Sequence, residues 1–137
     1  MTYNDIIEFV TQNPVCTFAT TDNKQPHNRA FLTNIINNKI YFTSATHKKV
    51  GQELLQNPHM ALCYLNSDAS VMLRITAKVE FEKSLEMKQK MIDEKPYLKS
   101  FRADDETFLL FTLSEAKAWF WSLEDNMREE GLEVFEF

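Results

Sequence analysis

Runs of alternating apolar and polar residues, separated by short polar turns, recur along most of this chain of 137 residues. The longest run is SVMLRITAKVEFE (70–82), which is rich in branched side chains. Strands of this length usually bend, and a bent antiparallel meander that buries one face tends to close into a barrel. The pattern therefore predicts a mainly β protein: an antiparallel barrel of six to seven strands, with short helices that cover its ends or one side.

The remaining elements follow from periodicity and turn chemistry. Runs with a period of two predict strands at 15–20, 27–36, 39–43, 59–65, 70–82, 107–113 and 116–123. Helical patterns follow the capping residues Thr2 and Ser84, a third helix is expected at 48–56, and Pro96 begins a further helical turn. We expect tight turns at Asn37-Asn38 and at Ser114-Glu115, because each pair separates two apolar runs.

Composition and charge argue against several classes of protein. A net charge of -5 without a basic stripe does not suit nucleic acid as a partner. No apolar run reaches the roughly eighteen residues of a membrane-spanning helix, so no membrane partner is expected. The N-terminus, MTYNDIIEFV, carries acids where a signal peptide carries Lys or Arg. We expect a single cytoplasmic domain, 1–137.

Cysteine, histidine and glycine occur in patterns that match no common catalytic motif. Cys16 and Cys63 lie inside apolar runs and are expected in the core rather than in a disulfide. His27, His47 and His59 share no metal-ligand spacing, so no metal site is expected. With only two glycines in the chain, a GxSxG, GxGxxG or P-loop motif is impossible.

Lys48 and Lys49 stand at the start of a predicted helix, where unpaired backbone N–H groups already carry partial positive charge. An anion at that terminus would accept hydrogen bonds from those N–H groups and from both ammonium groups. The hydroxyls of Thr43, Ser44 or Thr46 could add to them, and a phosphate group suits such a site. The alternative is that both lysines are simply solvated.

Two arginines lie within predicted strands, where a charged residue usually has a partner. With Asn37-Asn38 as the hairpin turn, Arg29 is expected on the same strand pair as Thr43. It could equally extend from an exposed face with its head group in water. Arg74, in the apolar run VMLRIT, is expected to form a pair on the sheet surface or at an interface.

Three segments together resemble the FMN-binding split β-barrel family of pyridoxamine 5′-phosphate oxidase. They are NRAFLTN (28–34), IYFTSATHKKVGQELLQNPHMALCY (40–64) and LRITAKVEF (73–81). The similarity covers about residues 5–123, and its most specific part is the strand–loop–helix segment of 40–62. The most similar subgroup is that of small single-domain proteins, including nitroimidazole-resistance-type proteins. The run ADDETFLLFTLSEAKAWFWSLED is similar to their C-terminal part.

The resemblance implies a homodimer with FMN bound non-covalently in a groove between the subunits. In that family a strand arginine and a basic pair hold the 5′-phosphate, an aromatic-Thr pair touches the phosphate and the ring edge, and a strand runs beside the isoalloxazine. Carried onto this sequence, the implied cofactor-binding residues are Arg29, Ala30, Asn34, Phe42, Thr43, Ser44, Lys48, Lys49 and Trp121. No residue is implied as catalytic.

Two departures from the family pattern bear on activity. Asn34 stands where the pyridoxamine 5′-phosphate oxidases have a lysine near the polar edge of the flavin, so an anionic reduced flavin would be less stabilised. Those oxidases also continue into a C-terminal segment with an Arg and a His for the substrate phosphate, whereas this sequence ends at EVFEF. Oxidation of pyridoxamine 5′-phosphate itself is therefore not expected.

Trp119 and Trp121 are expected on the same strand face as Lys117. In the family, an aromatic residue of the second subunit often abuts the flavin, and Trp121 is the candidate here. The alternative for both tryptophans is burial in the barrel core or at the dimer interface. Phe31 and Tyr64 are expected in the core.

Two functions remain open at this point. The first is a small oxidoreductase that transfers electrons or hydride through FMN to an unidentified small molecule. The second is a module that binds or carries FMN, or a related phosphate ligand, without turnover. Haem binding on the same barrel has less support, because no histidine lies in a convincing ligand context.

Overall fold

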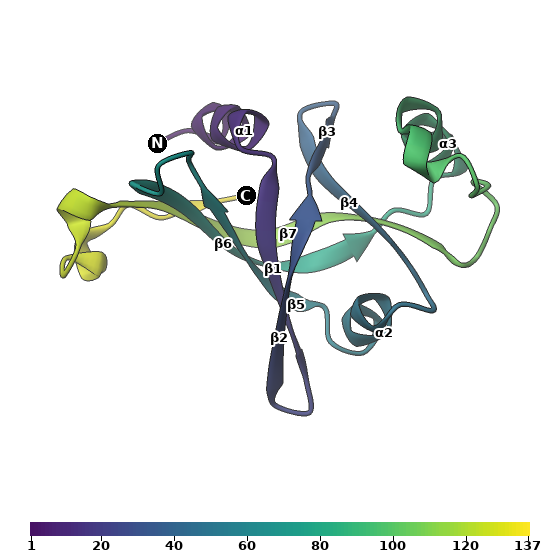
Figure 1. Cartoon of the computed structure of the whole chain (residues 1–137), viewed down its shortest axis with the longest axis horizontal. Coiled ribbons are helices and arrows are strands. Elements are labelled where there is room, and N and C mark those ends of the chain that lie inside the picture. The colour runs from purple at the N-terminus through teal and green to yellow at the C-terminus, as the bar shows by residue number, and fades with distance from the viewer.

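One antiparallel sheet dominates the computed structural model, which describes residues 1–137 (Figure 1). Its order is β2-β1-β5-β6-β7-β4-β3, with β8 paired to β7. The strands are β1 (Val15–Asp22), β2 (Gln25–Leu32), β3 (Asn34–Ile36), β4 (Lys39–Ala45), β5 (His59–Leu65), β6 (Val71–Phe81), β7 (Phe108–Ser122) and β8 (Phe135–Glu136). The helices are α1 (Tyr3–Gln12), α2 (Lys49–Gln56) and α3 (Leu85–Glu94), with short 3₁₀ turns at Pro96–Leu98, Leu123–Asp125 and Glu129–Gly131.

The sheet curls so that its two edge strands are formed by one continuous segment of the chain. The outermost strands, β2 and β3, are separated only by Thr33. On one side of Thr33 the chain pairs with β1, and on the other side it pairs with β4. The predicted mainly β split barrel with short peripheral helices is therefore confirmed.

The barrel interior is packed with aromatic and branched side chains. Phe18, Phe42, Phe111 and Tyr64 are fully buried. Three of them, the phenylalanines, pack against one another with ring centroids 5.3 to 6.0 Å apart. Each ring comes from a different strand: Phe18 from β1, Phe42 from β4, Tyr64 from β5 and Phe111 from β7. Phe31 packs against the same cluster, so the expected core positions of Phe31 and Tyr64 are confirmed.

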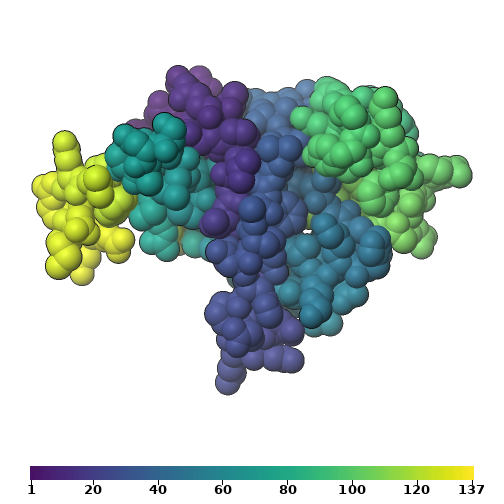
Figure 2. Space-filling view, in the orientation of Figure 1, coloured from purple at the N-terminus to yellow at the C-terminus, as the bar shows by residue number.

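The three helices cover different parts of the barrel. α1 contributes Ile6 and Val10 to the interior cluster, and α2 contributes Val50 and Leu54. α3 lies on the outer face, where it builds a second cluster with β3, β4 and β7 (Figure 1). β4 is therefore buried on both faces. In the space-filling view, the β1–β2 hairpin and the segment after β7 extend beyond the packed body (Figure 2).

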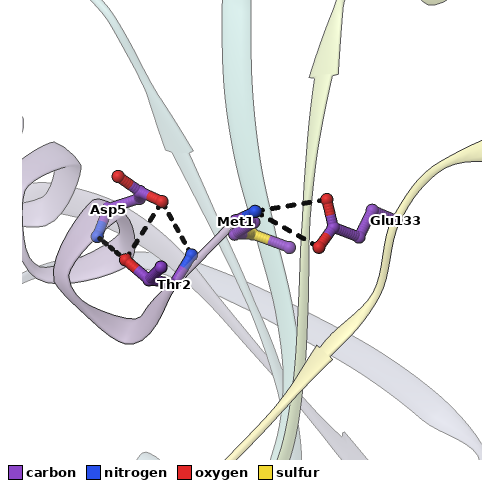
Figure 3. Close-up of polar contacts among 4 residues, drawn as sticks. All are labelled: Met1, Thr2, Asp5 and Glu133. Atoms are coloured by element: carbon purple, nitrogen blue, oxygen red, sulfur yellow. Dashed lines mark hydrogen bonds and ion pairs between the residues drawn. The ribbon is translucent and has the colours of Figure 1, made fainter.

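Helix α1 begins at the predicted capping box. The Asp5 backbone N–H donates to Thr2 Oγ1 at 3.3 Å, and the Thr2 backbone N–H donates to Asp5 Oδ2 at 2.7 Å (Figure 3). The Thr2 backbone N–H, and after it the Thr2 hydroxyl, lower the pKa of the Asp5 carboxyl by donating to it. The Met1 ammonium pairs with Glu133 at 3.2 Å, which joins the start of the chain to the segment before β8.

Two sequence predictions about strands are wrong. The run 27–36 is not one strand, because its pairing changes at Thr33: Thr33 still donates its N–H to the Pro14 carbonyl at 2.8 Å, in register with the β1–β2 ladder, whereas Asn34 begins the pairing with β4. Ser114-Glu115 is not a turn between two strands. β7 runs through it, and Glu115 adopts a φ of 49° in a bulge where the register with β6 shifts. A bulge absorbs the extra residue without ending the strand.

Most other boundaries agree with the sequence patterns. Asn37 and Asn38 have φ values of 51° and 61°, as a tight primed turn requires. Ser84 caps α3 by accepting the Met87 N–H at 3.2 Å. No helix is both long enough and apolar enough to cross a bilayer.

Candidate functional site

A cavity of about 680 Å³ opens where β2 separates from β4. β4 pairs with β3 only as far as Tyr41, and beyond that point neither β2 nor β4 pairs with the other. The start of α2 and the segment 97–101 enclose the remaining sides. Six of the nine implied cofactor-binding residues line this cavity: Arg29, Ala30, Thr43, Ser44, Lys48 and Lys49. A cavity of about 740 Å³ beside α3 contains none of them.

The amino end of α2 faces this cavity without a side-chain cap. Lys48 is the N-cap residue, its side chain makes no capping hydrogen bond, and the first turn contains no acid. The first N–H of the α2 ladder that finds a carbonyl is that of Gln52, which donates to Lys48 at 3.0 Å. The three N–H groups before it therefore lack helical partners and remain available to an anion.

Gly51 lets α2 approach the end of β4 closely. A Cβ atom at this position would collide with the carbonyl oxygen of Ala45. Any larger residue would therefore push the helix away from the strand, and the hydroxyl residues of β4 would lose their place beside the helix terminus. Glycine is needed here because there is no room for a side chain, and not because of a special backbone conformation.

Hydroxyl groups and cations complete one wall of the cavity. Ser44 is buried, and its Oγ has no hydrogen-bond partner. Lys48 and Lys49 are exposed and form no ion pair, and no Asp or Glu lines the cavity. A buried hydroxyl without a partner is costly, and a ligand with acceptor oxygens would satisfy it. The arrangement can therefore take a phosphate group.

Arg29 belongs to this wall, but it does not share a strand pair with Thr43. It lies on β2 opposite Phe18 of β1, and its side chain lines the cavity from that strand. Its Nη2 atom lies 3.5 Å from Glu53 Oε2 on α2. The partner that a strand arginine needs is thus a helical glutamate, which the sequence pattern did not indicate.

The opposite wall is apolar and was not predicted. Tyr97, Leu98 and Phe101 line it, and Phe101 packs on Phe108 with ring centroids 5.1 Å apart. Tyr97 is half-exposed at 54%. The four-residue spacing of the two aromatic residues after Pro96 is the only local signal for a shared face.

His47 also lines the cavity and lies at its exposed rim. Asp105 is a nearby acid whose pKa is affected by His47. The pKa of Asp105 is lowered mainly by the hydroxyl and N–H of Thr107, with smaller contributions from Arg102 and His47. Asp105 is therefore an ionised group just outside the basic wall.

Three implied residues lie outside the cavity. Phe42 points into the barrel and is fully buried, so its side chain cannot contact a ligand in the cavity. Asn34 lies opposite Tyr41, is 1% exposed, and both polar atoms of its amide lack partners. Trp121 is on the outer face of β7, opposite Met72.

The outer face of β5, β6 and β7 carries the remaining aromatic residues. Arg74 lies over the Trp119 ring at 5.0 Å, which gives this arginine the surface pair expected for it. A neighbouring row contains Leu65, Met72 and Trp121, which face one another across the three strands. All but Leu65 are partly buried in the single chain, and Leu65 is 48% exposed.

Comparison with known proteins gives one family match. The family model described as pyridoxamine 5′-phosphate oxidase matches residues 4–120. No curated protein sequence matches the chain.

Several solved structures share the fold. A NimC/NimA family protein from Clostridium acetobutylicum has a TM-score of 0.81 at 23% identity, covering 98% of this chain and 93% of that one. A pyridoxamine 5′-phosphate oxidase-related, FMN-binding protein from Nostoc punctiforme has a TM-score of 0.68 at 12% identity, covering 98% and 95%. A haem-binding protein from Mycobacterium smegmatis has a TM-score of 0.71 at 14% identity, covering 98% and 57%.

Proposed function

Because the chain belongs to the pyridoxamine 5′-phosphate oxidase family, we propose that it binds FMN in the cavity between β2, β4 and α2. The observation that carries this proposal is the uncapped amino end of α2, flanked by Lys48 and Lys49. Two ammonium groups beside free N–H groups disfavour each other unless an anion lies between them. The phosphate of FMN supplies that anion.

The residues of the cavity fit the other parts of the cofactor as well. The free edge of β2 near Ala30 offers backbone groups to a planar polar ring, and Tyr97 and Phe101 offer apolar surface on the other side. Ser44 Oγ would gain the partner that it lacks. When bound, FMN supplies a ring that accepts and donates electrons or hydride.

We propose further that the protein is a homodimer and that the flavin lies between its subunits. The outer row of Leu65, Met72 and Trp121 supports this proposal, because tryptophan and methionine are enriched where proteins associate. Trp121 would then reach the partner's flavin, as the family pattern implies.

The finer proposal is that the protein is an oxidoreductase acting on a small molecule. A module that binds FMN without turnover is the second candidate, and it is favoured by the lack of any carboxylate in the cavity wall. The residues would in both cases bind and orient the flavin. Only the first requires access for a second molecule at the ring.

The test is to add FMN to the purified protein and to measure flavin binding by fluorescence. We expect FMN to bind much more tightly than riboflavin, which lacks the phosphate. Equal affinity for both would contradict the phosphate assignment. NADH or NADPH should then reduce the bound flavin, with reoxidation by an acceptor, if the protein is an enzyme. Exchange of flavin without redox cycling would favour the carrier.

A further inference from the structure

Glu53 pairs with Arg29 of the cavity wall, and side chains of β1 and β2 hold it in place. It lies on α2 and is 9% exposed. Thr20 of β1 donates its hydroxyl to Glu53 Oε2, and Arg29 of β2 places Nη2 3.5 Å from the same oxygen. Arg29 Nη1 also donates to Thr20 Oγ1 at 2.8 Å. The three side chains form a closed polar network.

This network uses only part of the hydrogen-bonding capacity of Arg29. Nη1 donates to the Phe18 carbonyl at 3.1 Å and to Thr20, and Nη2 pairs with Glu53. Of the five N–H donors of a guanidinium, the Nε–H and one N–H of Nη2 are left without a partner. Arg29 also lines the cavity. An anion in the cavity would therefore bind beside Arg29, whose charge is already partly neutralised by Glu53.

We propose that Glu53 sets the affinity of the cavity for its anion by neutralising Arg29. This inference rests on the proposed function, since it takes the phosphate of FMN as the anion. A carboxylate removed from water interacts strongly with charges nearby. Glu53 therefore repels the phosphate while it holds Arg29, and the cavity binds FMN less tightly than its cations allow. Glu53 is a specificity-determining residue that does not itself touch the flavin.

The experiment is to measure FMN and riboflavin affinity for Glu53→Gln and for the unchanged protein. Gln retains the shape and can still accept the Thr20 hydrogen bond, but it carries no charge. We expect FMN to bind about tenfold more tightly to the variant, with a steeper salt dependence, because an unpaired cation then faces the phosphate. Riboflavin affinity should change little. Glu8→Gln, on the exposed face of α1, changes net charge equally and serves as control.

A second variant separates charge from positioning. Thr20→Val removes the bridging hydroxyl but leaves both charges, so FMN affinity should stay within about twofold if Glu53 acts through its charge. Weaker FMN binding by Glu53→Gln, or by Thr20→Val, would overturn the inference and show that the network only positions Arg29. Unchanged FMN affinity in Glu53→Gln would overturn it as well, and if that variant does not fold, Glu53→Ala, which also removes the charge, takes its place in the comparison. If the unchanged protein binds no FMN at all, the proposed function fails, and this inference fails with it.

Discussion

At the scale of single residues, the phosphate site depends on two lysines that form no ion pair within the protein. Changing Lys48 and Lys49 together to Ala should raise the Kd for FMN by several-fold to about a hundredfold, because two charge-assisted hydrogen bonds are lost. Isothermal titration calorimetry would measure this change. The matched control changes the exposed Lys39 and Lys83 to Ala. Unchanged affinity in a folded variant would rule out the phosphate assignment.

A buried thiol provides a second residue-scale prediction, on stability against pH. Burial raises the pKa of Cys16 from 9.0 to about 11, although Tyr64 and Thr33 hydrogen bonds oppose the shift. The folded state thus holds the thiol proton more tightly than the unfolded state does. This contribution to stability is complete below pH 9.0 and is lost as the pH rises through about 11. The pKa of Tyr64 is also raised by burial, so it acts in the same direction.

Urea unfolding across this alkaline range would measure the effect. Stability should fall by up to about 1.4 kcal/mol per pH unit for each such group. Cys16→Ala should show a shallower decline than the unchanged protein. Cys63→Ala is the comparison, because Cys63 is only partly buried and the charge of Arg74 opposes the rise of its pKa. Identical slopes for all three proteins would contradict the assignment to Cys16.

At the scale of elements, Thr33 is the residue at which one segment passes from pairing with β1 to pairing with β4. Its hydroxyl and that of Tyr64 are hydrogen-bonded at 2.8 Å inside the barrel. Thr33→Val would leave the Tyr64 hydroxyl buried without this partner, at a cost of about 1–3 kcal/mol. Chemical denaturation would show the loss. Tyr64→Phe in the same background should recover part of it, and a simple sum of the two losses would argue against a shared hydrogen bond.

The elements also show why sequence reasoning succeeded in some places and failed in others. The Asn37-Asn38 turn and the Thr2 cap depend on neighbours in the chain, and both were predicted. The bulge at Glu115 depends on pairing with β6, and the division at Thr33 depends on the change of partner from β1 to β4. The same polar residues with positive φ occur in a bulge and in a hairpin turn, so only the pairing with a neighbouring strand distinguishes the two.

The candidate site divides in the same way. Lys48 and Lys49 follow from a helix start and Arg29 from a charge within a strand, and a family resemblance added Ala30. Glu53 could not be assigned to the site from the sequence, because it lies on α2, its partner Arg29 lies on β2, and no sequence spacing links the two. The aromatic wall of Tyr97 and Phe101 reaches the cavity only through the packing of the segment after α3.

At the scale of the whole molecule, a second subunit is expected to pack on the outer row of β5, β6 and β7. The cavity between β2 and β4 would then lie near the interface. Met72→Glu places a charge in the middle of that row, beside Leu65 and Trp121. The unchanged protein should have twice the 16.1 kDa mass of the chain in solution, and the variant should have the mass of one chain. An ionised carboxylate in an apolar interface is costly, whereas the same side chain is solvated in a monomer. Light scattering after size-exclusion chromatography would measure both masses.

The same variant tests whether the flavin site needs the partner. Met72 does not line the cavity, so a loss of FMN affinity in a folded monomer would have to come from the missing subunit. We expect such a loss, because each flavin would then lack the Trp121 of the other subunit. Leu85→Glu, at an exposed apolar position on α3, is the matched control and should stay dimeric with full affinity. A monomeric Met72→Glu protein that binds FMN as tightly as before would confine the site to one chain.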